Sequence, residues 1–76
     1  MIDPITRIKI EKTLGDQEHK ERYFRECYRK TCDGKNFIVV TPLDETKEIT
    51  MVFDEETGEF AGLEQWSYIK ENGELL

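Results

Sequence analysis

Residues 28–41, which read Tyr-Arg-Lys-Thr-Cys-Asp-Gly-Lys-Asn-Phe-Ile-Val-Val-Thr, decide the fold. Asp33-Gly34 separates two runs of strand-forming residues and is typical of a two-residue type I′ hairpin turn. This turn sets the register, and it predicts four facing pairs: Cys32 with Lys35, Lys30 with Phe37, Tyr28 with Val39, and Glu26 with Thr41. Residues 37–41 are apolar on both faces, which predicts a central strand covered by a helix or by the curling sheet, and Pro42 ends it.

A helix over residues 16–32 is the alternative for the first arm of this hairpin. Tyr23, Phe24, Cys27 and Tyr28 have helical spacing, and Gly34 would act as a stop. Three acid-to-base pairs lie four residues apart: Glu18 with Arg22, Glu21 with Arg25, and Glu26 with Lys30. We prefer the strand because the apolar face covers only two turns and runs directly into the hairpin turn.

Upstream, residues 7–11 alternate charged side chains with isoleucines, which is typical of a strand with one buried face. We therefore predict a first strand from about Ile5 to Leu14. Residues 15–21, polar apart from Gly15, are predicted to be a solvated connection.

Downstream, residues 48–54 alternate with Ile49, Met51 and Phe53 on one side, and residues 54–59 form an Asp-initiated turn with a glycine. We predict a second hairpin here, whose returning arm starts at Phe60 and reaches Trp66 and Tyr68. Asn72-Gly73 offers a further two-residue turn before a final strand stub.

A short helix is the alternative for the end of this returning arm. Leu63, Trp66 and Ile69 would lie along it, with Gly62 at its start and Gly73 at its end.

Together these elements predict a mainly β, single domain over residues 1–76. It is an antiparallel meander of five or six strands that forms a curled sheet or a minimal barrel. The alternative is an α+β fold with residues 16–32 helical against a three- to four-stranded antiparallel sheet. A meander has two free edges, so a homodimer joined through the sheet edges is also expected.

The formal net charge of −6 is distributed unevenly along the chain. Residues 1–35 carry nine Lys/Arg and seven Asp/Glu, a net of +2, whereas residues 36–76 carry two Lys/Arg and ten Asp/Glu, a net of −8. The two halves therefore face different partners, or each other.

Acidic side chains gather around the second hairpin, and such a surface would steer a basic protein surface toward it. We predict a small non-enzymatic interaction protein, an inhibitor or regulator, that binds a basic protein partner. The predicted binding residues are Glu48, Asp54, Glu55, Glu59, Glu64 and Trp66, with Asp44, Glu45 and Glu56 in the same acidic group. Trp66, with Tyr68, would add an aromatic anchor.

Residues 20–35 support an alternative function, because basic and aromatic side chains interleave there as in single-stranded nucleic-acid binders. The residues concerned are Arg22, Tyr23, Arg25, Tyr28 and Arg29. Three acids in the same segment and a pI near 4.7 argue against nucleic acid as the main partner. The competing interpretation is that the aromatics are core residues and the charges form cross-strand pairs.

Catalytic and metal-binding signatures are weak. Cys27 and Cys32 have only His19 as a further ligand of the zinc type, and a core this small leaves little room for a substrate pocket. We therefore expect no enzyme activity, no metal and no cofactor. No apolar stretch approaches the roughly 18 residues of a membrane span, so we expect no membrane association. Two cysteines are too few for a disulfide-rich scaffold and are expected to be free thiols in a reducing compartment, so we expect a cytoplasmic protein.

Overall fold

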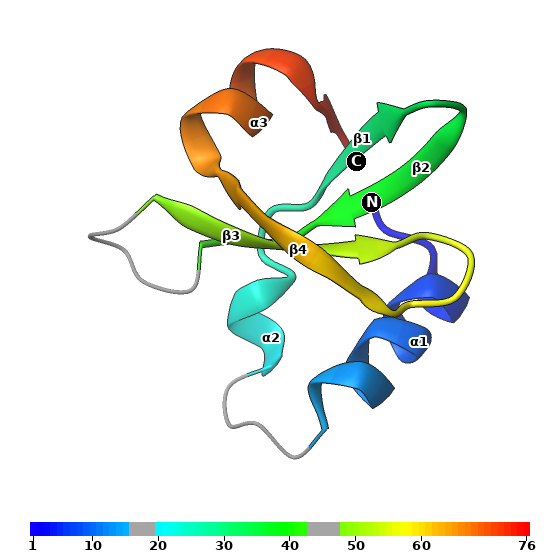
Figure 1. Cartoon of the computed structure of the whole chain (residues 1–76). Coiled ribbons are helices and arrows are strands. Elements are labelled where there is room, and N and C mark those ends of the chain that lie inside the picture. The colour runs from blue at the N-terminus through cyan, green and yellow to red at the C-terminus, as the bar shows by residue number, and fades with distance from the viewer. Residues whose placement is uncertain (16–19, 43–47) are drawn as a thin grey trace.

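The computed structural model describes residues 1–15, 20–42 and 48–76 (Figure 1). In chain order the elements are α1 (Pro4–Leu14), α2 (Lys20–Tyr23), β1 (Tyr28–Cys32), β2 (Lys35–Val39), β3 (Ile49–Asp54), β4 (Phe60–Gln65), α3 (Trp66–Asn72) and β5 (Glu74–Leu75). Most of the predicted connection at residues 15–21, the histidine His19, and the acids Asp44 and Glu45 lie outside the described residues.

The strands form one antiparallel sheet in the order β4-β3-β2-β1-β5, so the predicted curled, mainly β sheet is confirmed and is not closed into a barrel. The β1–β2 register is the predicted one for Cys32 with Lys35, Lys30 with Phe37, and Tyr28 with Val39. Glu26 and Thr41 also meet, although the Thr41 hydroxyl makes the contact by accepting from the Glu26 N–H at 3.1 Å. The turn is of type I′, because Asp33 and Gly34 both have positive φ angles, 53° and 79°.

The predicted strand from Ile5 to Leu14 is wrong, because this segment is helix α1. Asp3 caps the helix by accepting a hydrogen bond from the Thr6 N–H at 3.2 Å, and Pro4 occupies its first turn. Ile8 and Ile10, which the alternation assigned to one face, lie apart: Ile8 is 53% exposed and Ile10 is fully buried. Capping at Asp3 and the helical spacing of the buried residues outweigh a five-residue alternation.

The alternative helix over residues 16–32 is not formed as a unit, because its described part contains only the four-residue α2 before β1 begins. The preferred strand is therefore confirmed for Tyr28–Cys32, whereas Lys20–Tyr23 is helical. The returning arm of the second hairpin ends at Gln65 rather than reaching Tyr68, and Trp66 begins α3. The helical alternative is right for Trp66, Ile69 and Gly73, and wrong for the residues still in β4.

Helices cover both faces of the sheet, with α1 and α2 on one side and α3 on the other (Figure 1). The α1 side holds the larger core cluster, which includes Ile10, Ile38 and Phe53. The α3 side holds a smaller cluster around Tyr28, Val39, Val52 and Ile69. Strand β2 is central and contributes to both clusters, as its apolar sequence predicts.

The last strand is a two-residue stub, as predicted, but it does not extend the meander. β5 pairs with β1, at Tyr28 with Leu75 and Arg29 with Glu74. Helix α3 therefore carries the chain across the sheet from one edge to the other. No helix in the described parts of the chain is long and apolar enough to cross a membrane.

Candidate protein-binding site on strand β4

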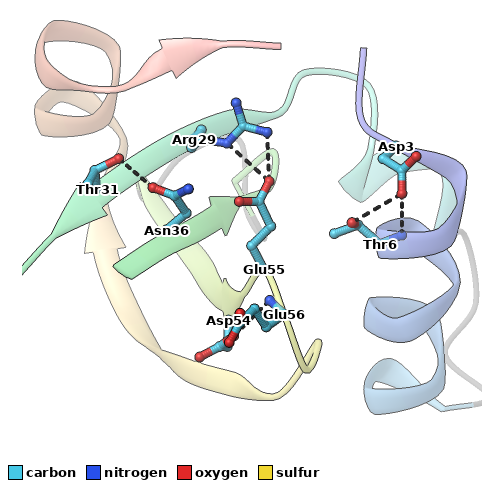
Figure 2. A network of polar contacts seen from close by, with 8 residues as sticks. All are labelled: Asp3, Thr6, Arg29, Thr31, Asn36, Asp54, Glu55 and Glu56. Atoms are coloured by element: carbon cyan, nitrogen blue, oxygen red, sulfur yellow. Dashed lines mark hydrogen bonds and ion pairs between the residues drawn. The ribbon is translucent and has the colours of Figure 1, made fainter. Parts of the chain in front are cut away.

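Three of the predicted acidic binding residues form ion pairs with the β1–β2 hairpin. The Arg29 guanidinium donates to Glu55 at 2.6 and 3.0 Å (Figure 2). Two further pairs join the hairpins: Lys30 with Glu64 at 2.7 Å and Lys35 with Asp54 at 3.1 Å. The basic and acidic halves of the chain therefore face each other at these positions, and these carboxylates are less available to an external partner.

Asp54 has a structural role at the turn after β3. Its Oδ1 accepts from the backbone N–H groups of Glu56 at 2.8 Å and Thr57 at 3.2 Å. The Lys35 ammonium and these two N–H donors lower the pKa of Asp54. The carboxylate thus holds the turn that joins β3 to β4.

Glu64 and Trp66 are also tied to the fold on the α3 side of the sheet. The hydrogen bond from Lys30 is the main cause that lowers the pKa of Glu64. The Trp66 ring is half-buried and meets the Tyr28 ring edge-on, with 5.4 Å between ring centroids. Trp66 therefore packs on the smaller core cluster, and it does not stand out as a surface anchor.

Glu48 and Glu59 are the two predicted binding residues that remain exposed, and no described residue pairs with either carboxylate. Their backbones mark the two ends of the β3–β4 ladder. The Trp66 N–H donates to the Glu48 carbonyl at 2.6 Å, and the Asp54 N–H donates to the Glu59 carbonyl at 2.9 Å. These two exposed acids therefore flank β4, about 20 Å apart for a strand of this length.

Strand β4 is an edge of the sheet, and no described strand pairs with its outer side. Because antiparallel residues alternate in direction, the inward N–H of Trp66 directs the backbone N–H and C=O of Leu63 away from β3. The N–H of Gln65, which also points away, donates instead to the Glu64 side chain at 3.2 Å. The edge therefore presents backbone groups that another strand could bind.

Two large apolar side chains lie exposed along this edge, Phe60 at 52% and Leu63 at 60%. Phe60 pairs with Phe53 and Leu63 with Met51, so both lie on the α1 side of the sheet. They share a face although they are three residues apart, because a register shift between Val52 and Phe53 inserts one residue into β4. The result is an apolar strip between two acids.

Sequence reasoning did not single out Phe60 and Leu63. The available signal was the spacing of the two side chains around Ala61-Gly62, which breaks strict alternation and is typical of a β-bulge. That signal locates the bulge. The exposure of the two side chains depends on where α1 lies, and this could not be foreseen because residues 5–14 were predicted to be a strand.

The residues of the nucleic-acid alternative do not form one surface. Tyr23 packs against the larger core cluster, whereas Tyr28 is buried in the smaller cluster on the opposite face. Arg29 is engaged by Glu55, while Arg22 is exposed in α2 and Arg25 is exposed just after it. The aromatic rings therefore lie in the core, as the competing interpretation predicts, and provide no common stacking platform.

Cys27 and Cys32 lie on opposite sides of the sheet and are both free thiols. Burial raises the pKa of the Cys27 thiol to about 11, whereas Cys32 is exposed. Within residues 1–15, 20–42 and 48–76, no three His, Cys, Asp or Glu side chains lie together as metal ligands would. A cavity of about 630 Å³ lies beside Arg7, Phe24 and residues at both chain ends. Arg7 is already held there by Glu11 and the Phe24 ring.

In comparisons with known proteins, no family model, curated protein or solved structure matches this chain. Its function is therefore inferred from its own residues and geometry.

Proposed function

We propose that this protein is a small non-enzymatic binding module whose β4 edge pairs with an extended, basic segment of a partner protein. The observation that carries the proposal is the β4 edge, with which no described strand pairs. Phe60 and Leu63 are exposed along it, and an exposed acid that no described residue pairs with lies at each end. Strand addition would satisfy the outward backbone groups of β4, and the apolar strip would contact the added strand.

Charge complementarity selects a basic segment as the occupant. Glu48 and Glu59 lie at the two ends of β4, and Glu56 adds a further exposed carboxylate at the turn. A segment with apolar residues in the middle and Lys or Arg near its ends matches this arrangement. Binding of this kind withdraws the segment from its other contacts, which is how an inhibitor or regulator acts. The two free thiols support a reducing compartment, so we place the protein in the cytoplasm.

The test uses two pools of ten-residue peptides, each with a randomised centre drawn from Val, Ile, Leu, Phe, Thr and Ser. One pool has Lys-Lys at each end and the other has Glu-Glu. We expect immobilised protein to enrich the base-flanked pool, and added salt to weaken that binding. Equal enrichment of both pools contradicts the charge part of the proposal.

Matched variants separate the site from general surface properties. The double variant Phe60→Ser/Leu63→Ser should abolish peptide enrichment, whereas Ile5→Ser/Ile8→Ser, which removes two exposed isoleucines of α1, should not. Glu48→Lys/Glu59→Lys should weaken binding more than Glu21→Lys/Glu71→Lys, which makes the same change in net charge at other exposed positions. If both members of either comparison behave alike, the site does not lie at β4.

A second copy of this chain is the other strand that could pair with β4. Analytical ultracentrifugation of the wild-type protein over a range of concentrations distinguishes the two occupants. A dimer that is lost in Phe60→Ser/Leu63→Ser, together with no peptide enrichment, would assign the edge to self-association and overturn the proposal.

A further inference from the structure

A groove opens on the α3 side of the sheet, directly beside the β4 edge. It has a volume of about 190 Å³, and Phe37 and Val52 line it from the two central strands. One wall comes from residues 61–64 of β4, and the other comes from β1 at Lys30 and Cys32.

The curvature of the sheet forms this groove. β1 and β4 are separated in the sheet by β2 and β3, yet Lys30 on β1 reaches Glu64 on β4 at 2.7 Å. The same Lys30 ammonium lies 5.4 Å from the centre of the Tyr68 ring of α3. The ion pair therefore bridges the concave face where α3 meets it, and the groove is the part of that face that extends away from the helix.

Gly62 has no side chain, so the groove is open toward the outer edge of β4. It pairs with Val52, so a side chain at this position would lie on the concave face, and a Cβ built there meets no atom within 4 Å. At about 190 Å³ the groove is smaller than the pockets that hold drug-sized ligands, which begin at roughly 300 Å³. It suits a single side chain.

A strand added to β4 would direct one side chain toward this groove. Residues that face each other on paired strands point to the same side of the sheet, so the residue opposite Gly62 points to the concave side. With no Gly62 side chain in the way, it passes over the strand toward Val52 and Phe37. Its two neighbours in the added strand point to the other side, toward Phe60 and Leu63.

We infer that the groove is the specificity pocket of the binding edge and holds one large apolar side chain, aliphatic or aromatic, from the partner residue opposite Gly62. The inference rests on the proposed function. It adds the requirement that the partner segment carry a large apolar residue opposite Gly62, flanked by apolar residues that contact the opposite face of β4.

Cys32 provides a direct readout, because it lines the groove and is exposed, while Cys27 is buried on the other side of the sheet with a raised pKa. At pH 8 iodoacetamide should therefore alkylate Cys32 selectively. The probe is the tightest-binding base-flanked peptide from the pool. At ten times its Kd we expect it to slow alkylation of Cys32 about tenfold.

Alanine substitution along the same peptide identifies the groove residue. One apolar position should lose affinity on the order of tenfold or more when changed to alanine, and that peptide should no longer protect Cys32 when its concentration is matched to the wild-type peptide. On the protein, Cys32→Phe fills the groove and should weaken binding. Thr31→Phe is the matched control, because Thr31 is exposed on the opposite face of β1.

The outcomes separate this inference from the proposal beneath it. Protection of Cys32, together with weaker binding by Cys32→Phe but not by Thr31→Phe, supports the groove. A peptide that binds wild-type protein but not Phe60→Ser/Leu63→Ser, and that leaves Cys32 alkylation and Cys32→Phe binding unchanged, overturns the groove and leaves the binding edge intact. Absence of any peptide binding to the wild-type protein overturns both.

Discussion

The two hairpins of this sheet use their charges differently. In the β1–β2 hairpin, Arg29, Lys30 and Lys35 each pair with an acid contributed by the second half of the chain. In the β3–β4 hairpin, some acids are engaged by these pairs, while Glu48, Glu56 and Glu59 stay exposed without a described partner. The opposite net charges of the two halves therefore reflect the contact between the hairpins as much as the outer surface, and only the acids left outside these pairs are available to a partner.

The largest expected effect is a difference in stability between variants of the buried and the exposed phenylalanine of the β3–β4 hairpin. Phe53 is 1% exposed and Phe60 is 52% exposed, although their rings meet edge-on. Phe53→Ala should cost about 3–5 kcal/mol, which approaches the whole free energy of unfolding of a domain this small. Phe60→Ala should cost less than about 1 kcal/mol.

Urea unfolding followed by circular dichroism measures both variants. A similar loss of stability for Phe60→Ala and Phe53→Ala would show that Phe60 belongs to the core, and the apolar strip of the binding edge would then lose one of its two members.

The glycines of the two hairpin turns sharpen the comparison further, because only one of them contacts a helix. Gly34 and Gly58 both have positive φ, 79° and 76°. A Cβ at Gly58 would lie 2.6 Å from Lys9 in α1, whereas a Cβ at Gly34 meets nothing within 4 Å. Each change to alanine should cost about 1–2 kcal/mol for the left-handed conformation, and Gly58→Ala should cost about 1–3 kcal/mol more.

The difference between the two glycine variants measures the docking of α1 against the β3–β4 turn. That docking includes hydrogen bonds from Lys9 to the Glu56 carbonyl at 2.7 Å and from Thr13 to the Gly58 carbonyl at 2.7 Å. Equal destabilisation of Gly34→Ala and Gly58→Ala in chemical unfolding would contradict the close approach of the helix.

A smaller effect distinguishes paired from free acids. In a double-mutant cycle, Arg29→Met and Glu55→Gln should show a coupling of about 0.5–1 kcal/mol that decreases with salt, since both side chains remain partly exposed. Glu59→Gln is the matched control and should show no coupling with Arg29→Met. A coupling near zero for Glu55 would mean that the two hairpins are held by their apolar contacts alone.

Local chemistry explains which parts of the fold could be predicted from sequence. Asp33-Gly34 and the Asp54-initiated turn specify their own backbone geometry, so both hairpins and the register of the first were predicted correctly. The strand prediction for residues 5–14 is wrong because it rests on a short isoleucine alternation, whereas Asp3-Pro4 starts a helix. A helix of this length gains most of its stability from packing against the rest of the protein, so local propensity alone does not decide between helix and strand here.

The candidate site was predictable only in part, because it depends on contacts between segments far apart in the chain. Nothing near Asp54, Glu55 or Glu64 indicates that Lys35, Arg29 and Lys30 neutralise them. The charge difference between the halves is consistent with contact between them, but it does not identify the residues that pair. Glu48 and Glu59 remain candidate binding residues because the structure shows that the other acids among the predicted binding residues are engaged in ion pairs.

The pH dependence of stability tests the two pairs that involve Lys35 and Lys30. The pKa values of Asp54 and Glu64 are lowered from their ordinary values of 3.8 and 4.5, chiefly by hydrogen bonds from Lys35 and Lys30. A carboxylate with a lowered folded pKa stabilises the fold above its unfolded pKa and loses this contribution as pH falls through the folded value. The free energy of unfolding should therefore be nearly constant from pH 7 to about pH 5 and should fall below about pH 4.

The double variant Asp54→Asn/Glu64→Gln should flatten this acid limb. Asparagine keeps an oxygen that can accept from the N–H groups of Glu56 and Thr57, so the turn is preserved while the titration is removed. Urea unfolding at a series of pH values measures the slope directly. An unchanged slope between pH 5 and 3 would show that other carboxylates set the acid stability, and that the charges joining the hairpins contribute less than their geometry implies.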